Sequence, residues 1–158
     1  MKGLSGLEEG QLAGLCETSP AVHFATCVQI QDKNGAWVQP VPNILQLRMS
    51  QTFEIFQELG RPCRMVVCKP RQVGCSTFAQ EIVYLKCRKD TSRALTISDL
   101  ADNSASLMEK AKDYKTHDHY PWDSKMRSTA KRIDLDNGSV MEIDTAENPK
   151  AGIGKTRQ

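Results

Sequence analysis

Residues 69–76 have the residue types of a loop that binds phosphate. Such a loop combines a tight turn, whose backbone amides face the anion, with the positive end of a following helix. The segment reads KPRQVGCS and places glycine and serine as the motif GxxxxGK[ST] does, but Lys69 replaces the first glycine and Cys75 replaces the lysine. Lys69 and Arg71 supply the positive charge from earlier in the loop. We expect this segment to hold a multiply charged anion, such as the phosphates of a nucleotide.

A second segment, residues 149–156, also comes close to the motif. It reads PKAGIGKT, with glycine, lysine and hydroxyl in frame and Pro149 in place of the first glycine. Arg157 and Gln158 alone follow it in the sequence, so no helix N-terminus is supplied to face an anion. We favour residues 69–76, because phosphate binding depends on the succession of strand, loop and helix more than on the letters.

The residues around the first loop predict the elements that must position it. Residues 64–68 form a short apolar run between two prolines, which predicts a buried strand. Apolar residues recur on one face over residues 76–88, which predicts a helix. A strand at residues 93–98 is expected to follow, and then a helix that Asp99 or Asp102 can cap and that runs to about Lys115. This alternation predicts an α/β fold with a central, mainly parallel sheet flanked by helices.

The rest of the chain predicts shorter elements. Ser50 can cap a helix, and Asn137–Gly138 is the signal of a tight hairpin turn near the C-terminus. The other expected elements are a helix over residues 5–17, strands at residues 26–31 and 36–39, a helix over residues 51–59, and hairpin strands at residues 133–135 and 140–143.

The composition is that of an ordinary globular protein. The chain has 158 residues, of which 39% are hydrophobic, and a net charge of +2, which excludes collagen-like, disordered and polybasic proteins. It has no apolar run of the roughly 18 residues that a membrane helix needs, and no signal-peptide core, so we expect a cytoplasmic protein. The six cysteines lack a C-x-x-C pair, so we expect reduced thiols, and we expect no metal site on them or on the three histidines. Residues 51–100 contain eight basic and five acidic side chains, which favours anion binding there.

Residues 69–77, which read KPRQVGCST, resemble the variant Walker A segment of terminase large subunits. These are the ATPases that drive DNA into the heads of tailed bacteriophages. Members of that family commonly read RQxGxST there, and some carry a basic residue earlier in the loop in place of the usual lysine. Residues 47–51, LRMSQ, resemble the upstream glutamine motif of the family, and residues 93–98 resemble its second core strand. The NGS hairpin and the GIGKT segment resemble the stretch before the Walker B strand, so the resemblance covers roughly residues 20–158.

The resemblance implies a P-loop NTPase-like domain that is incomplete in this chain. Residues 1–45 would form an N-terminal helix and hairpin region, and residues 46–158 a partial ATPase core that stops before Walker B. The full protein would bind ATP and Mg²⁺, hydrolyse ATP, translocate double-stranded DNA and cut it with a nuclease domain. It would act in the host cytoplasm as an oligomeric ring, with a portal protein and a small terminase subunit as partners.

The resemblance also assigns roles to residues of the loop. Gly74 would let the backbone approach the β-phosphate, and Lys69 and Arg71 would neutralise phosphate charge. Arg71 matches a family position that stabilises the transition state, which makes it the candidate catalytic residue. Ser76 would offer its hydroxyl to Mg²⁺, with Thr77 as a substitute. Without the resemblance, the same residues read as a solvated basic loop, a turn glycine and a helix N-cap.

The other candidate binding residues are Gln72 and Val73 within the loop, Cys75 and Gln51. Gln51 would read adenine through its amide, although a surface glutamine on a helix has the same sequence signature. Cys75 stands in the lysine position and carries no positive charge, so we expect weak nucleotide binding and, without Walker B, essentially no turnover. An Mg²⁺-dependent ATPase activity that disappears in a Gly74→Asp variant would contradict this expectation.

Two alternatives fit the same residues. A helicase-like P-loop ATPase shares an upstream glutamine and a phosphate loop, and the sequence that continues the gene would separate the two ATPase classes. A non-catalytic nucleic-acid-binding module would use the basic residues between Arg61 and Arg93. Such a module predicts DNA binding that weakens steeply with salt and is indifferent to Lys69→Ala.

Overall fold

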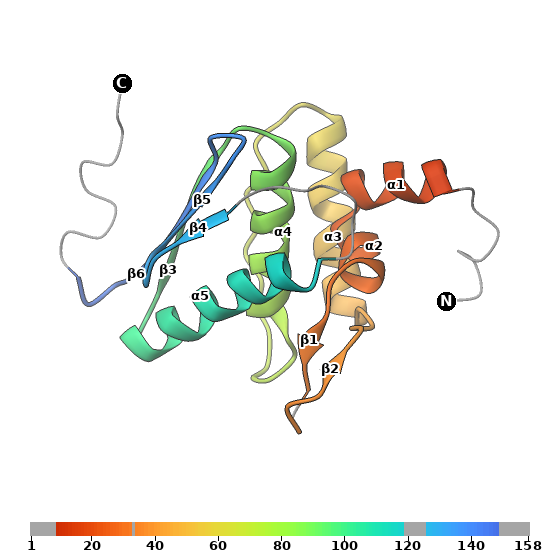
Figure 1. The fold of residues 1–158 in the computed structure, drawn as a ribbon. Helices are drawn as coiled ribbons and strands as arrows, with labels where there is room; N and C mark the ends of the chain where they lie inside the picture. The colour runs from red at the N-terminus through yellow and green to blue at the C-terminus, as the bar shows by residue number, and fades with distance from the viewer. Residues whose placement is uncertain (1–8, 33, 119–125, 149–158) are drawn as a thin grey trace.

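The computed structural model describes residues 9–32, 34–118 and 126–148 (Figure 1). The helices are α1 (Glu9–Thr18), α2 (Pro20–Thr26), α3 (Ile44–Glu58), α4 (Cys75–Lys89) and α5 (Ala101–Thr116). The strands are β1 (Ile30–Gln31), β2 (Trp37–Val38), β3 (Arg93–Ser98), β4 (Met126–Ser128), β5 (Arg132–Leu135) and β6 (Val140–Thr145). None of the helices described is long and apolar enough to cross a membrane.

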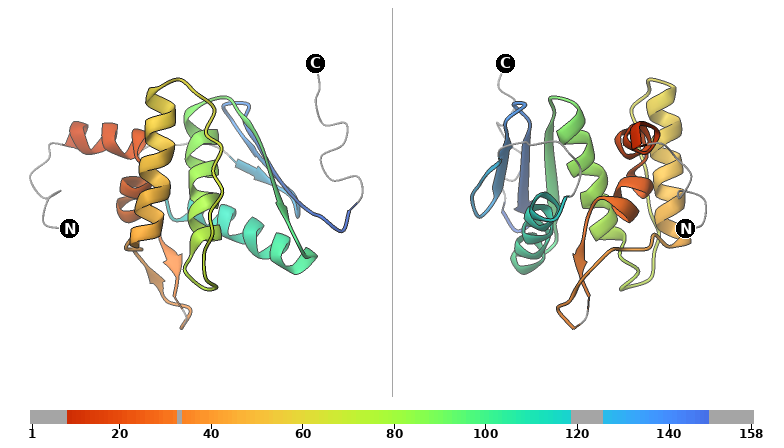
Figure 2. Two further views of the ribbon diagram at one scale, coloured as in Figure 1. Left: turned by 180° about the vertical axis from the view of Figure 1, so that it is seen from behind. Right: turned by 45° about the vertical axis from the view of Figure 1, so that its right-hand side comes forward.

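The main sheet has the strand order β3-β6-β5-β4. β3 runs parallel to β6 with Arg93 opposite Val140 and Ser98 opposite Thr145, while β6, β5 and β4 pair antiparallel. Figure 2 shows the sheet on one side, α4 and α5 beside it, and α1, α2 and α3 beyond α4. α4 contacts β3 and β6 on one side and α2 and α3 on the other. The structure is therefore a mixed α/β arrangement with α4 at its centre.

The prediction of a mainly parallel sheet is wrong for the part of the chain that the structure describes. One strand pairing is parallel and two are antiparallel. The reason is that residues 64–68, expected to be a strand, do not join the sheet; residues 61–70 form no helix or strand. Their exposure alternates nevertheless: Met65 and Val67 pack against the core, while Val66 is 93% exposed. This segment therefore has the alternating exposure of a strand, but no neighbouring strand pairs with it in the described part of the chain.

The N-terminal third also differs from expectation. The Ser19–Pro20 pair, which reads as a break, begins α2: the Ser19 hydroxyl accepts a hydrogen bond from Val22 N, and Pro20 occupies the first turn, where its missing N–H costs nothing. The strand expected over residues 26–31 is reduced to β1. The helix expected after Ser50 begins earlier, because Asn43 caps it and Ser50 lies inside α3.

Other elements form as the sequence predicts. α4 and β3 cover the expected residues. α5 begins at Ala101 with Leu100 as its cap residue, so neither Asp99 nor Asp102 caps it. The Asn137–Gly138 pair turns the hairpin of β5 and β6, with Gly138 at a φ of 83°. Packing between helices contributes to the core: the rings of Phe24 on α2 and Phe78 on α4 meet edge to face, with their centroids 5.3 Å apart.

A buried cluster of charged groups joins α2, α4 and the chain after α5. The Nδ1 of His23 lies 2.5 Å from a carboxylate oxygen of Glu81, and its Nε2 lies 3.6 Å from Asp118. Asp118 also forms an ion pair with Arg88 and accepts a hydrogen bond of 3.0 Å from the Tyr84 hydroxyl. Burial lowers the pKa of His23, but the carboxylates of Asp118 and Glu81 raise it by more, to about 10. His23 is therefore a buried cation that holds α2 to α4.

We expect His23→Gln to lower the free energy of unfolding by roughly 3–5 kcal/mol at pH 6, because the variant leaves buried carboxylates without their cation. The pKa of His23 rises from 6.5 to about 10 on folding, so its stabilisation is complete below pH 6.5 and is lost as the pH rises through 10. Urea unfolding at pH 6 and pH 10 measures the difference between the two proteins, which should shrink at the higher pH.

His117→Gln is the matched control for this measurement. The His117 ring stacks on the Trp37 ring outside the buried cluster, with the ring centroids 3.7 Å apart. Replacing it should therefore lower the free energy of unfolding by less than about 1 kcal/mol. A His23→Gln effect of the same size at both pH values would show that the histidine packs there without carrying charge.

Candidate functional site

The loop before α4 turns through two residues with positive φ. Gln72 has a φ of 62° and Gly74 a φ of 70°, and Gly74 is the cap residue of α4. The cap makes no side-chain hydrogen bond to the helix. Backbone amides beside left-handed residues can form anion-binding concavities, and the first turn of a helix carries unsatisfied N–H groups and partial positive charge. The backbone here has the form that a phosphate loop requires.

The capping box of α3 fixes this loop in place. The Asn43 side chain accepts hydrogen bonds from the first turn of α3, and Gln46 reaches back to Asn43 N at 2.9 Å. The same two side chains donate to the loop: Asn43 Nδ2 to the Val73 carbonyl at 2.9 Å, and Gln46 Nε2 to the Gly74 carbonyl at 3.1 Å. One pair of amides thus begins α3 and holds the last turn before α4.

A hollow of about 760 Å³ lies beside the loop, between α4, β3 and α5. Its charged side chains are mainly basic: Lys69 and Arg71 come from the loop and Lys110 from α5, whereas Asp99 follows β3. The remaining lining residues are Ser76, Ala79, Gln80, Val83, Thr96, Ile97, Ser98, Leu100, Asn103, Ser106 and Leu107. The excess of positive charge at the N-terminal end of α4 favours an anionic ligand.

Gln80 lines this hollow and also carries an unsatisfied, fully buried polar atom. Its side chain is 2% exposed, and its Oε1 accepts a hydrogen bond of 3.2 Å from the Thr96 hydroxyl. Its Nε2 has no hydrogen-bond partner among the residues that the structure describes. A buried amide donor left in this state costs about 1–3 kcal/mol, and this atom is shielded from the hollow by the atoms around it.

Three of the predicted binding residues meet at the hollow. Lys69, Arg71 and Ser76 all line it, so the candidate catalytic arginine and the candidate Mg²⁺ ligand share one space. Gly74 lies at the turn into α4. Gln51 is exposed on α3 and is not among the lining residues, so the structure does not bring the expected adenine-reading residue to this hollow.

The other loop residues serve the turn and the core. Gln72 is exposed at the turn and Val73 is half-buried beneath it. Cys75, in the position of the usual lysine, is buried within the hydrophobic core. Thr77 is half-buried, and its carbonyl accepts a hydrogen bond of 2.7 Å from the Tyr114 hydroxyl. The Cys75 side chain therefore packs in the core, whereas a lysine at this position of the motif reaches toward the phosphates.

Sequence reasoning missed Asn43, Gln46 and Gln80. The first two have capping-box spacing, N-x-x-Q, which is a readable signal for the start of α3 but not for its contact with the loop. Gln80 gives no signal, because a glutamine inside a helix usually faces solvent. The GIGKT segment, which belongs to the second candidate phosphate loop, lies outside the described residues.

The donor atoms suit a metal ion only if it arrives with a ligand. No group of three or more His, Cys, Asp or Glu side chains within the described residues could hold a metal ion. Ser76 and Asp99 supply one hydroxyl and one carboxylate to the lining. Mg²⁺ is commonly bound by one or two protein oxygens together with substrate phosphates and water. These residues therefore fit Mg²⁺ bound through a triphosphate.

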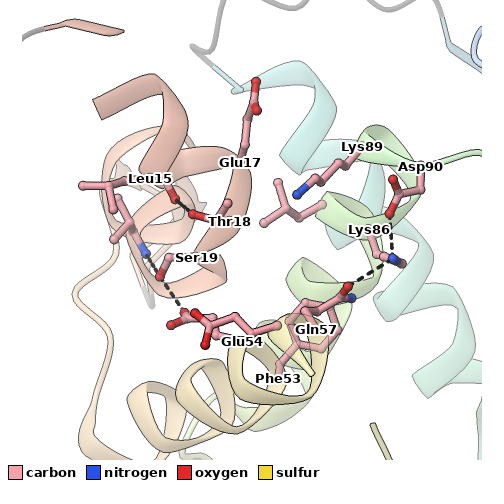
Figure 3. A pocket seen from close by; sticks show the side chains of 13 residues that line it. Leu15, Glu17, Thr18, Ser19, Phe53, Glu54, Gln57, Lys86, Lys89 and Asp90 are labelled. Carbon is pink, nitrogen blue, oxygen red and sulfur yellow. Dashed lines mark hydrogen bonds and ion pairs between the residues drawn. The ribbon is translucent and has the colours of Figure 1, made fainter. Parts of the chain in front are cut away.

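A second hollow of about 540 Å³, between α1, α3 and the end of α4, is a weaker candidate (Figure 3). Its polar groups largely satisfy one another. Glu54 accepts hydrogen bonds from Ser19 and Ser50, and Lys86 pairs with Asp90 at 2.6 Å. The lining also carries two further glutamates beside Glu54, at positions 17 and 58. This hollow offers a phosphate fewer unpaired positive groups than the loop before α4.

Gly74→Ala is expected to destabilise the protein by more than Gly60→Ala. Both glycines have positive φ, 70° and 61°, so either alanine costs about 1 kcal/mol in backbone strain. At Gly74 the added Cβ would also lie 2.9 Å from Gln46 Nε2, whereas at Gly60 it would meet nothing within 4 Å. The excess, about 0.5–1.5 kcal/mol per lost hydrogen bond, is measurable by urea unfolding. A Gln46→Ala background should remove it, and equal costs at the two glycines would show that Gln46 does not hold the loop.

Comparison with known proteins adds no family assignment to this geometry. The sequence matches none of the protein-family models, and no curated protein matches it significantly.

Proposed function

We propose that residues 69–77 are the nucleotide-binding loop of a bacteriophage DNA-packaging terminase large subunit, and that they bind the triphosphate of ATP. The observation that carries the proposal is the meeting of Lys69, Arg71 and Ser76 on one hollow at the N-terminal end of α4. The resemblance to the variant Walker A segment gives these three residues their roles. Lys69 and Arg71 would neutralise phosphate charge, Arg71 would also be catalytic, and Ser76 would bind Mg²⁺.

Each part of the site has a task in binding a triphosphate. The lysine and arginine would neutralise phosphate charge through charge-assisted hydrogen bonds. The first turn of α4, which no side chain caps, would donate amides to a phosphate oxygen. The positive charge needed here comes from the loop, since Cys75 faces the core.

Mg²⁺ would be held by the Ser76 hydroxyl and by phosphate oxygens, and the Asp99 carboxylate lines the same hollow. When bound, the ion would neutralise charge that develops on the phosphates during transfer. Arg71 would add positive charge on the same side. In this proposal, ATP hydrolysis drives double-stranded DNA translocation in the full-length ring, with the portal protein and the small subunit as partners in the host cytoplasm.

One structural finding weighs against a complete P-loop fold. The strand that should precede the loop, residues 64–68, is not hydrogen-bonded into the sheet. The proposal therefore rests on the loop, on α4 and on the side chains that line the hollow. Binding, rather than turnover, is the property that the described residues support.

Mg²⁺-ATP binding to the intact chain, measured by calorimetry or with a fluorescent ATP analogue, tests the proposal. Replacing Lys69 and Arg71 together with alanine should weaken binding at least tenfold, because each charge-assisted hydrogen bond contributes about 1.5–3 kcal/mol. Replacing Arg61 and Arg64 together with alanine is the matched control: it also removes two exposed positive charges, but outside the hollow's lining. Inorganic triphosphate should compete with ATP, whereas adenosine should not.

Equal ATP affinity in the double variant and the control would overturn the proposal. Binding of double-stranded DNA, measured on the same variants, distinguishes the ATPase from a non-catalytic nucleic-acid-binding module. Such a module would bind DNA with an affinity that falls steeply with salt and that Lys69→Ala does not change.

A further inference from the structure

Two cysteine sulfurs lie in contact at the junction of α1 and α2. The Sγ of Cys16, on α1, is 3.3 Å from the Sγ of Cys27, the residue that ends α2. The Thr26 hydroxyl lies 3.3 Å from each sulfur. Both thiols are free and buried, with Cys16 1% and Cys27 6% exposed. Neither residue belongs to the proposed nucleotide site.

The surroundings make the two sulfurs chemically unequal. The Cys27 thiol donates its hydrogen bond to the Cys16 sulfur, and this contact, opposed by burial and aided by Thr26 and the charge of His23, lowers the pKa of Cys16 to about 6. The same contact and burial raise the pKa of Cys27. At neutral pH the pair therefore consists of one thiolate, the reactive form of cysteine, beside one thiol.

Cys87 shows what burial does without such neighbours. It is as buried as Cys16, and burial raises its pKa to about 11. Burial alone therefore gives an inert thiol in this protein. The pairing of the sulfurs with Thr26 and the nearby His23 cation is what distinguishes Cys16.

We propose that Cys16 and Cys27 are a reversible redox pair, in which a peroxide oxidises Cys16 and Cys27 then closes a disulfide between α1 and the end of α2. An S–S bond is about 2.05 Å long, so the sulfurs must approach by little more than 1 Å. A shift of this size needs side-chain adjustment and a small movement of α1 against α2.

The chemistry balances with hydrogen peroxide as the oxidant. The Cys16 thiolate attacks one peroxide oxygen, the O–O bond breaks, and hydroxide leaves to become water with the proton that Cys16 had released. The sulfur has then lost two electrons and is a sulfenic acid. The Cys27 sulfur attacks it, an S–S bond replaces the S–O bond, and the departing hydroxide takes the Cys27 proton. In total, two thiols and one peroxide give a disulfide and two waters.

Peroxide treatment of the reduced, intact chain, followed by alkylation in denaturant and mass spectrometry, tests the pair. Trypsin leaves both cysteines in one peptide, because no Lys or Arg lies between Lys2 and Lys33. That peptide should be about 2 Da lighter than its reduced form and should resist alkylation. Cleavage after Glu17 should leave two peptides joined by the disulfide, and dithiothreitol should separate them.

Matched variants assign the steps. A Cys63→Ser/Cys68→Ser background removes the two thiols that are not buried and should leave the disulfide unchanged, as should Cys87→Ser. In that background, Cys27→Ser should stop the reaction at a Cys16 sulfenic acid that dimedone traps, whereas Cys16→Ser should leave Cys27 alkylatable. The oxidised protein should melt about 5–10 °C higher than the reduced one, because the crosslink lowers the conformational entropy of the unfolded chain.

The measurement on the unaltered chain decides the proposal even if a variant fails to fold. Cys16 and Cys27 that both remain alkylatable, while Cys63 or Cys68 is oxidised, would overturn it. A disulfide that joins either cysteine to a different partner would overturn it as well.

Discussion

The buried cation of His23 is the interaction on which the arrangement around α4 depends. It joins a helix near the N-terminus to two carboxylates, one on α4 and one after α5, which lie 58 and 95 positions further along the chain. A buried charge without partners would be very costly, so these segments must meet in one geometry. These contacts hold the side of α4 that faces away from the sheet. They therefore also help to position the loop at the N-terminus of α4.

The elements that local patterns define could be predicted from the sequence. α4 follows from its apolar face, β3 from its apolar interior, and the hairpin of β5 and β6 from Asn137–Gly138. The errors arose where the same residues allow two structures. A proline after Ser19 can break one helix or begin another, and only the serine's contact with Val22 decides. Residues 64–68 have the apolar character of a strand, but a strand also requires a neighbour, which local sequence cannot reveal.

The candidate site was predictable to a similar degree. Lys69, Arg71 and Ser76 could be chosen because charge and hydroxyl at these spacings have a known use, and the structure places all three on one hollow. The support for the loop was not predictable: Asn43 and Gln46 come from another helix, and Gln80 faces inward from the middle of α4. Such contacts depend on how helices pack, so a single sequence carries little trace of them. The expectation for Gln51 had only its motif to support it.

The outer edge of β3 has a consequence of its own. β3 pairs with β6 on one side, and within the described residues no strand pairs with its other side. Leu95 is 40% exposed and Ile97 51% exposed on this strand, so apolar side chains accompany backbone groups without a sheet partner. Native proteins protect such edges with charges, prolines or short strands, and this one is six residues long with an apolar interior. The molecule therefore presents a template onto which a further strand, from this polypeptide or another, could extend the sheet.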